Sequence, residues 1–258
     1  MTAKQKIVLH NPRGSTYLPY DGPPMAILVV ASLLEPEKYD IKILDWHYPE
    51  INKRIAEECK LDAVSVLTPM FISPSQEQLV THYQAIAAST SLPVLLYNNP
   101  PKTGVNLAPA TVAKLAETPN IVSIKDSSGD LTVTAEYIRL TKHRDDFNVL
   151  MGRDTLIYGA LCYGAAGSIA ACANVAPRLC ADIYDKYQAG DLKGSLEAQF
   201  TLAPLRLAFT IGTFPAVIKE SLEMLGIEAG PCMAPVGPMT STEREKLRGV
   251  LVQMGLLQ

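Results

Sequence analysis

Lys125 and Tyr97 are the residues of this sequence best placed to do chemistry, because each ends an apolar run. The run Ile121–Lys125 is β-branched and typical of a buried parallel strand, and Val94–Tyr97 is the preceding run of this kind. A lysine amine that is shielded from water loses its proton more readily, and the neutral amine can attack a carbonyl carbon to form a Schiff base. A tyrosine hydroxyl at the neighbouring strand end can carry a proton. The pair therefore indicates an aldolase site.

Alternating strand and helix patterns position these two residues. Strands are expected over Ile7–His10, Ile41–Asp45, Ala63–Leu67, Val94–Tyr97, Val122–Lys125, Val149–Met151 and Gly167–Ala171. Helices are expected between them, over Pro24–Leu34, Glu50–Lys60, Gln76–Ala88, Ala108–Ala116, Val133–Lys142 and Thr155–Tyr163. Continuous apolar strands that alternate with helices predict a parallel sheet covered by helices. The expected fold class is α/β, a TIM-barrel-like parallel βα barrel of seven or eight strands.

The chain from Ala176 onward has a different pattern and predicts a C-terminal helical extension. Its expected helices are Pro177–Ala189, Leu192–Thr210, Phe214–Leu225 and Thr242–Met254. The run Thr240–Arg244 has the hydroxyls and first-turn acid of a helix start. Gly190 and Gly226 stand where helices are expected to stop, and the proline-rich run Pro231–Pro238 predicts a rigid connector.

Composition excludes several kinds of partner. The 258 residues carry a formal net charge of −3, which gives no basic surface for nucleic acid. The most apolar early run, Ala26–Leu34, is far shorter than the roughly 20 residues of a membrane span. The five cysteines form no C-x-x-C pair, so no metal or redox site is expected. We therefore expect a cytoplasmic protein that has no metal or cofactor and binds neither nucleic acid nor membrane.

Five stretches of the sequence carry a resemblance to a known enzyme superfamily. They are Asp62–Pro69 (DAVSVLTP), Tyr97–Gly104 (YNNPPKTG), Ile124–Asp130 (IKDSSGD), Gly164–Ile169 (GAAGSI) and Phe214–Lys219 (FPAVIK). With these motifs in order, the chain from about Leu61 to its end resembles the dihydrodipicolinate synthase / N-acetylneuraminate lyase superfamily. The resemblance implies class I aldolase chemistry on a barrel.

The same resemblance implies roles for particular residues. Lys125 would form a Schiff base with a 2-oxo acid such as pyruvate, and Tyr97 would relay the proton. The implied substrate-binding residues are Thr68, Lys102, Gly152 and Ile169. Asp154 follows Gly152 and Arg153 and either caps the next helix or lines this site.

The chain departs from the family pattern in three places. It has no Gly-Thr-Thr-Gly-Glu type loop, which in the family holds the carboxylate of the 2-oxo acid. Met70 and Phe71 stand where the synthases carry a tyrosine pair, and Pro101-Lys102-Thr103 replaces Gly-Arg-Thr. Lysine does not replace a bidentate arginine like for like. These departures predict weakened positioning of the substrate, which costs rate.

Residues 1–60 differ in kind from the rest. The runs Lys6–Pro12, Gly22–Glu35 and Tyr39–Asp45 are similar to the start of flavodoxin-like cobalamin-binding domains. Asp45-Trp46-His47 does not continue as an Asp-x-His-x-x-Gly motif, so no corrin is expected. We predict an engineered chimera with a seam near 59–61, and with domains over 1–60, 61–175 and 176–258. The flavodoxin-like order would place Ile7–His10 beside Ala63–Leu67.

Two functions follow from this sequence. The first is a chimeric α/β scaffold from a Schiff-base-forming 2-oxo-acid lyase or aldolase, with little or no parental activity. The alternative is an active class I aldolase or lyase that condenses or cleaves pyruvate-type 2-oxo acids through Lys125. Its only expected partner is a small 2-oxo acid, and the expected assembly is a monomer or homodimer.

Overall fold

A computed structural model describes residues 5–11, 39–45 and 63–258, with side chains described for residues 63–258. The chain divides into two compact units. One comprises Ala63–Ala203, and the other comprises Met1–Asp62 with Pro204–Gln258. The division falls inside the long helix α9, Leu192–Ala208. The three domain ranges expected from the sequence remain predictions.

The unit over Ala63–Ala203 is built on a five-stranded parallel sheet. Its strands are β3 (Val64–Leu67), β4 (Val94–Asn98), β5 (Ile121–Asp126), β6 (Asn148–Met151) and β7 (Gly167–Ser168). They pair in the order in which they occur along the chain, and every pair is parallel. Because the chain returns to the same edge before each new strand, the carboxyl ends of all five strands lie at one end of the sheet.

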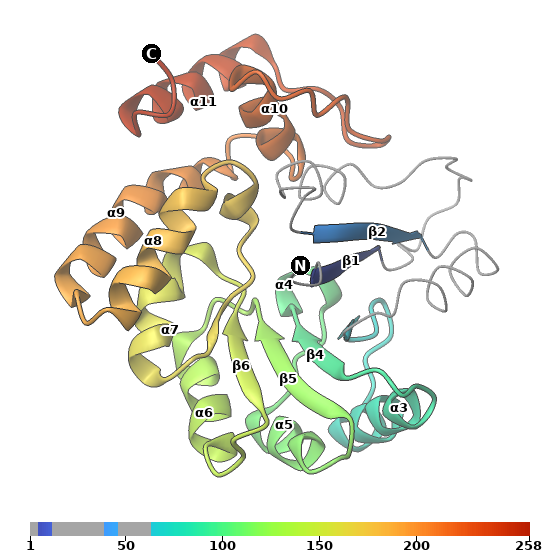
Figure 1. The fold of residues 1–258 in the computed structure, drawn as a ribbon. Coiled ribbons are helices and arrows are strands. Elements are labelled where there is room, and N and C mark those ends of the chain that lie inside the picture. The colour runs from blue at the N-terminus through green and yellow to red at the C-terminus, as the bar shows by residue number, and fades with distance from the viewer. Residues whose placement is uncertain (1–4, 12–38, 46–62) are drawn as a thin grey trace. The chain divides into compact units, whose positions relative to one another are not determined.

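Helices connect these strands and follow the last of them (Figure 1). They are α3 (Gln76–Ala88), α4 (Pro100–Thr103), α5 (Pro109–Ala116), α6 (Leu131–Thr141), the 3₁₀ turn Asp154–Leu156, α7 (Ile157–Tyr163), the 3₁₀ turn Ala171–Asn174 and α8 (Pro177–Gln188). The α/β class and the parallel strand order expected from the sequence are therefore present in this unit.

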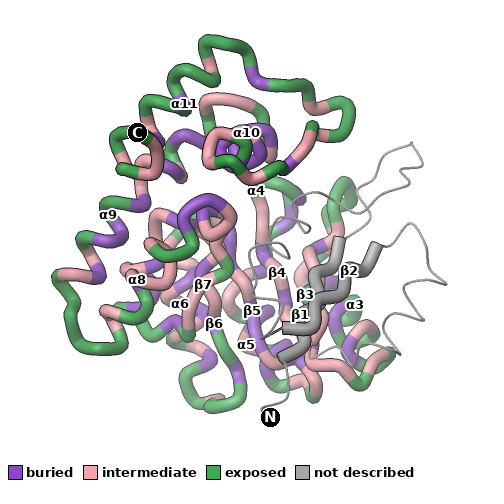
Figure 2. Tube along the Cα trace, turned by 45° about the horizontal axis from the view of Figure 1, so that its top comes forward, coloured by how far each residue is buried: buried purple, intermediate pink, exposed green. Residues whose placement is uncertain are grey.

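The core of this unit lies between the sheet and helices α3, α5 and α6. Leu96 of β4 and Ile124 of β5 are register partners, and both are completely buried. They belong to one apolar cluster with Leu79 and Tyr83 of α3 and Leu115 of α5. Figure 2 colours the buried stretches of the chain purple, including parts of β4 and β5. Successive strand residues point to opposite faces of the sheet, so every second side chain faces this core. The side chains between them point to the other face.

Capping side chains begin helices α3 and α6, and α6 starts two residues earlier than the expected Val133. Ser75 caps α3 by accepting a hydrogen bond from the backbone of Gln78, whose side chain bonds back to Ser75. Asp130 caps α6 by accepting from the backbone nitrogens of Thr132 and Val133. The caps fix the starts of two helices that follow β3 and β5.

The other unit contains β1 (Gln5–Asn11) and β2 (Tyr39–Asp45), which form a parallel pair of their own, Gln5 opposite Tyr39. A β1–β2 pair occurs both in the flavodoxin-like order and in a barrel order, so it does not decide between them. The order with β1 beside β3 stays a prediction. The helices expected over Pro24–Leu34 and Glu50–Lys60 lie outside the described residues.

Helices α10 (Ala216–Met224) and α11 (Ser241–Gln253) also belong to this unit. Thr240 caps α11 and forms a reciprocal pair with Glu243, as its sequence predicts. Lys219 of α10 is 6% exposed, and its ammonium donates to the carbonyl oxygens of Ala229 and Pro231 at 3.0 and 2.8 Å. The lysine thereby holds the proline-rich connector, which contains no helix.

Two sequence expectations need correction. The strand expected over Gly167–Ala171 is only two residues long, because Ala171 already begins a 3₁₀ turn. Asp154 does not cap a helix: it is the first residue of its own 3₁₀ turn, and its buried carboxylate accepts a hydrogen bond from the backbone of Cys172. Among the described residues, no helix is long and apolar enough to cross a membrane.

Candidate functional site

Tyr97 and Lys125 stand opposite each other on neighbouring strands. They are register partners at the carboxyl ends of β4 and β5, so their side chains leave the sheet on the same face. The Lys125 Nζ lies over the Tyr97 ring, 4.2 Å from the ring centroid. Both side chains are partly buried. The pair predicted from two separate sequence runs is thus brought into contact.

Three polar groups surround the Tyr97 hydroxyl. Asn99 Nδ2 donates to it at 3.2 Å, and Ser127 and Lys125 are polar neighbours. Burial raises the pKa of Tyr97, but the positive charge of Lys125 and the polar side chains of Ser127 and Asn99 outweigh it, so the net pKa lies below the ordinary value for tyrosine. A phenol of this kind gives up and regains its proton more easily, as a proton relay requires.

Gly152 leaves room beside the Lys125 side chain. Its backbone N–H donates to the Asp126 carbonyl oxygen at 2.6 Å, which draws the end of β6 against β5. A Cβ atom on Gly152 would lie 3.0 Å from Lys125 Cε, 2.9 Å from the Asp126 carbonyl oxygen and 2.0 Å from Ser127 Oγ. Real side chains do not tolerate such distances, so only glycine fits here without movement of β5.

Thr68 is buried at the end of β3. Its hydroxyl donates to Thr103 Oγ1 at 2.9 Å, and its backbone N–H donates to the Tyr97 carbonyl oxygen at 3.2 Å. The side chain therefore ties β3 to the end of α4. Its substrate-binding role stays a prediction.

Lys102 and Ile169 follow strand ends at the same edge of the sheet. Lys102 is exposed in α4, directly after β4. Ile169 is 43% exposed after β7, and its backbone N–H bonds to the Met151 carbonyl oxygen. Their side chains are accessible, but no measured contact joins them to Lys125. Their part in substrate binding also stays a prediction.

Ser127 and Asn99 were missed by the sequence reasoning. Each lies two residues beyond a reactive residue, Ser127 after Lys125 and Asn99 after Tyr97, and strand periodicity would return both to the reactive face. That signal was available in the sequence. The signal is weak, because both residues lie past the apolar runs that mark the strands.

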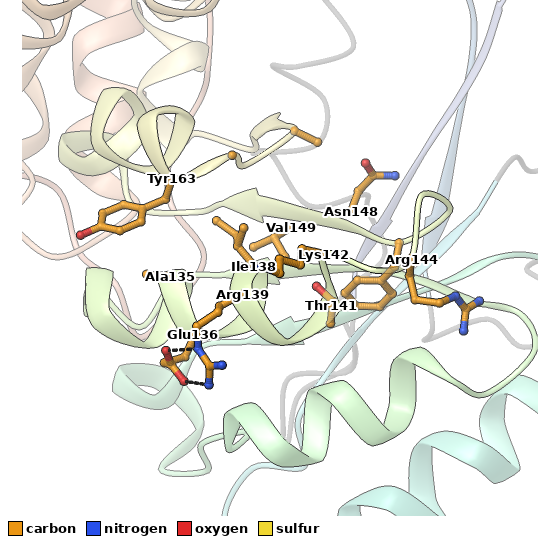
Figure 3. A pocket seen from close by; sticks show the side chains of 13 residues that line it. Ala135, Glu136, Ile138, Arg139, Thr141, Lys142, Arg144, Asn148, Val149 and Tyr163 are labelled. Carbon is orange, nitrogen blue, oxygen red and sulfur yellow. Dashed lines mark hydrogen bonds and ion pairs between the residues drawn. The ribbon is translucent and has the colours of Figure 1, made fainter.

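One groove of this unit lies away from Lys125. It has a volume of about 590 Å³ and is lined by α6, α7 and the residues around the start of β6, including Phe147, Asn148 and Tyr163 (Figure 3). These residues lie at the amino ends of the strands, whereas the reactive pair lies at the carboxyl ends. In α/β barrels the chemistry occurs at the carboxyl ends, so we assign the site by its residues and not by this groove.

No cluster of three or more histidine, cysteine, aspartate or glutamate side chains with the spacing of a metal site occurs in the part of the chain whose side chains are described.

The parallel strand order with functional residues at its carboxyl edge defines the class as an α/β fold of the TIM-barrel kind. Comparisons with known proteins agree. Residues 53–254 match the model of the dihydrodipicolinate synthetase family, so the chain belongs to this family.

Individual relatives show how close the likeness is. A 4-hydroxy-tetrahydrodipicolinate synthase of Methanothrix thermoacetophila is 39% identical over 201 residues, which is 78% of this chain and 68% of that protein. The crystal structure of dihydrodipicolinate synthase from Thermotoga maritima has a TM-score of 0.78 and 33% identity, covering 90% of this chain and 81% of that one. YagE, a prophage protein of this family from E. coli K12 solved with pyruvate, has a TM-score of 0.78, 25% identity and the same coverages.

Proposed function

We propose that the protein is a class I aldolase or lyase that condenses or cleaves pyruvate-type 2-oxo acids through a Schiff base on Lys125. The observation that carries this proposal is the contact between Lys125 Nζ and the Tyr97 ring at 4.2 Å, at the carboxyl ends of two parallel strands. Membership of the dihydrodipicolinate synthetase family supports it, as does the relative solved with pyruvate.

The reaction would begin at the lysine. The neutral amine of Lys125 attacks the C2 carbonyl carbon, the carbonyl oxygen takes up protons and leaves as water, and an iminium remains. Loss of a C3 proton then gives an enamine, whose C3 carbon forms the new bond to an aldehyde carbon. Water finally hydrolyses the iminium and releases Lys125.

Tyr97 would move protons during these steps. Its hydroxyl accepts a hydrogen bond from Asn99, and its lowered pKa favours proton exchange with the departing oxygen. Thr68, Lys102, Gly152 and Ile169 are proposed to surround the substrate, Gly152 by leaving space beside Lys125. No cofactor is needed for this chemistry.

The scaffold with little or no activity is the second candidate. It is favoured by the replaced motif at Met70 and Phe71, which are 41% and 96% exposed, and by Lys102 in place of an arginine. A flavodoxin-like origin of residues 1–60 and a chimeric history would account for the missing carboxylate-binding loop, but only the sequence pattern supports them. The likeness to synthases gives more support to the active enzyme.

Hydrogen exchange at C3 of pyruvate separates the two candidates. An enamine on Lys125 exchanges these hydrogens for deuterium in D₂O, which proton NMR follows as loss of the methyl signal. We expect exchange with the wild type, slower exchange with Tyr97→Phe and none above background with Lys125→Arg. Equal rates for the wild type and Lys125→Arg would reject the aldolase and leave the scaffold.

A further inference from the structure

A buried polar pair lies directly behind the reactive pair. Asn98 and Asp126 are the next register partners after Tyr97 and Lys125, and both are completely buried. Because strand residues alternate, their side chains point to the opposite face of the sheet, toward the helices. Nothing in the proposed chemistry uses them.

The Asp126 carboxylate is held by neutral donors. It accepts hydrogen bonds from Asn98 Nδ2 at 3.0 Å, from the Ser128 backbone and hydroxyl at 3.0 Å each, and from Thr134 Oγ1 at 2.6 Å. These four bonds come from β4, from the loop after β5 and from α6. Burying a carboxylate is costly unless such donors surround it, so its geometry is closely constrained.

Asn98 extends the network to the loop after α4. Its Oδ1 accepts from the Leu107 backbone at 3.0 Å, and its Nδ2 donates to Asn106 Oδ1 at 3.0 Å and to the Tyr137 hydroxyl at 3.1 Å. The Tyr137 hydroxyl donates in turn to the Leu107 carbonyl oxygen. Burial, and then the negative charge of Asp126, raise the pKa of Tyr137, which keeps this phenol protonated as a donor.

The network therefore joins the ends of β4 and β5 to the loop after α4 and to α6. Its strand residues, Asn98 and Asp126, directly follow Tyr97 and Lys125. A hydrophobic pair at 98 and 126 would avoid the desolvation of a carboxylate, but it would impose no directional bonds on the strand ends. Fixed strand ends matter here, because displacement of reacting groups by about 1 Å can cost about two orders of magnitude in rate.

We propose that Asn98 and Asp126 are positioning residues, which hold the ends of β4 and β5 so that Lys125 stays over the Tyr97 ring. This inference deepens the proposed function and rests on it. The alternative is that these hydrogen-bonded polar side chains contribute only to the stability of the fold.

A substitution at Thr134 perturbs the network without changing a residue of either strand. Thr134→Val keeps the shape of the side chain but removes the 2.6 Å donor to Asp126, and Thr134→Ser restores the hydroxyl. Thr141→Val is the matched control, because Thr141 is also buried on α6 and its hydroxyl donates to the Tyr137 carbonyl oxygen, a bond within the helix. Thermal unfolding of each variant reports the loss of stability.

Pyruvate exchange then separates positioning from stability. We expect Thr134→Val to lower the saturating exchange rate about tenfold, with the half-saturating pyruvate concentration changed less than about twofold. Thr134→Ser should recover most of the rate, and Thr141→Val should keep it. Equal losses of rate in Thr134→Val and Thr141→Val would overturn the positioning role.

A second measurement needs no catalysis. NMR titration of ring-labelled Tyr97 should show its pKa rising toward the ordinary tyrosine value in Thr134→Val, as the contact with Lys125 loosens, and not in Thr141→Val. An unchanged titration in Thr134→Val would also overturn the inference. If the wild type shows no pyruvate exchange, the proposed function fails, and the Tyr97 titration alone still decides whether the network positions the pair.

Discussion

At the scale of single residues, Gly152 is where added volume has the largest effect on the proposed chemistry. A methyl group there meets both the reactive lysine and a backbone carbonyl that the end of β5 holds in place. The backbone oxygen cannot rotate away, unlike the Ser127 hydroxyl. Relief therefore requires movement of β5 relative to β6, which displaces Lys125 from the Tyr97 ring.

We expect Gly152→Ala to lower the pyruvate exchange rate by about a hundredfold or more, because the reacting groups are shifted. Circular dichroism should show a folded protein. Gly159→Ala is a suitable control, since its Cβ would contact a single Leu131 methyl carbon at 3.2 Å, a flexible side chain. A Gly152→Ala protein as active as the wild type would show that the site accommodates a methyl group without displacing Lys125.

The pairing of Lys125 with Tyr97 could be predicted from the sequence, but most of the contacts that support this pair could not. Lys125 and Tyr97 end apolar runs, which the sequence displays directly. Asn98 and Asp126 come one residue later and look like ordinary polar residues of a loop. Their function depends on Tyr137 and Thr134, which approach from α6 and are distant in the sequence.

At the scale of elements, the start of α11 depends on one capping residue. Thr240 accepts from the Glu243 backbone at 3.3 Å, and the Glu243 carboxylate accepts from the Thr240 backbone at 2.7 Å. Thr240→Ala removes the first bond, which typically costs about 1 kcal/mol. We expect this loss in urea unfolding, with Thr240→Ser close to the wild type. An unchanged stability in Thr240→Ala would mean that the cap contributes nothing to the stability of the protein.

Elements with strong local signals were predicted closely. Helix α3 has the bounds that periodicity indicates, because Ser75 caps it and its apolar face packs on the sheet. The turn of helix at Pro100–Thr103 was not predicted, since two prolines usually indicate a loop. They fit here because the first helical positions need no backbone donor.

At the scale of the whole molecule, an exposed apolar loop bears on assembly. Met70, Phe71 and Ile72 are 41%, 96% and 62% exposed, and Phe71 has a φ of 76°, which is unusual for a bulky residue. Three adjacent apolar side chains in water favour contact with another protein surface.

We expect a monomer or homodimer in solution, measured by light scattering. If a homodimer uses this loop, Phe71→Ser should weaken it and leave the monomer folded. Ser73→Ala, on an exposed polar neighbour, is the control. A stable tetramer would contradict the expectation, because it would require contact surfaces in addition to those that the sequence indicates.

The family and the order of strands β3 to β7 could be predicted from motifs and periodicity. The sequence did not decide whether the departures at Met70, Phe71 and Lys102 abolish activity. That outcome depends on the position of a substrate carboxylate, which requires contacts from several strand ends at once.

The central claim is that Lys125 forms a Schiff base with a pyruvate-type 2-oxo acid. Incubation with pyruvate, reduction with sodium borohydride and peptide mass spectrometry test it directly. We predict a stable adduct on the peptide that contains Lys125, dependent on pyruvate and absent in Lys125→Arg. An unmodified Lys125 after reduction, or an adduct that is confined to other lysines such as Lys102, would contradict the account.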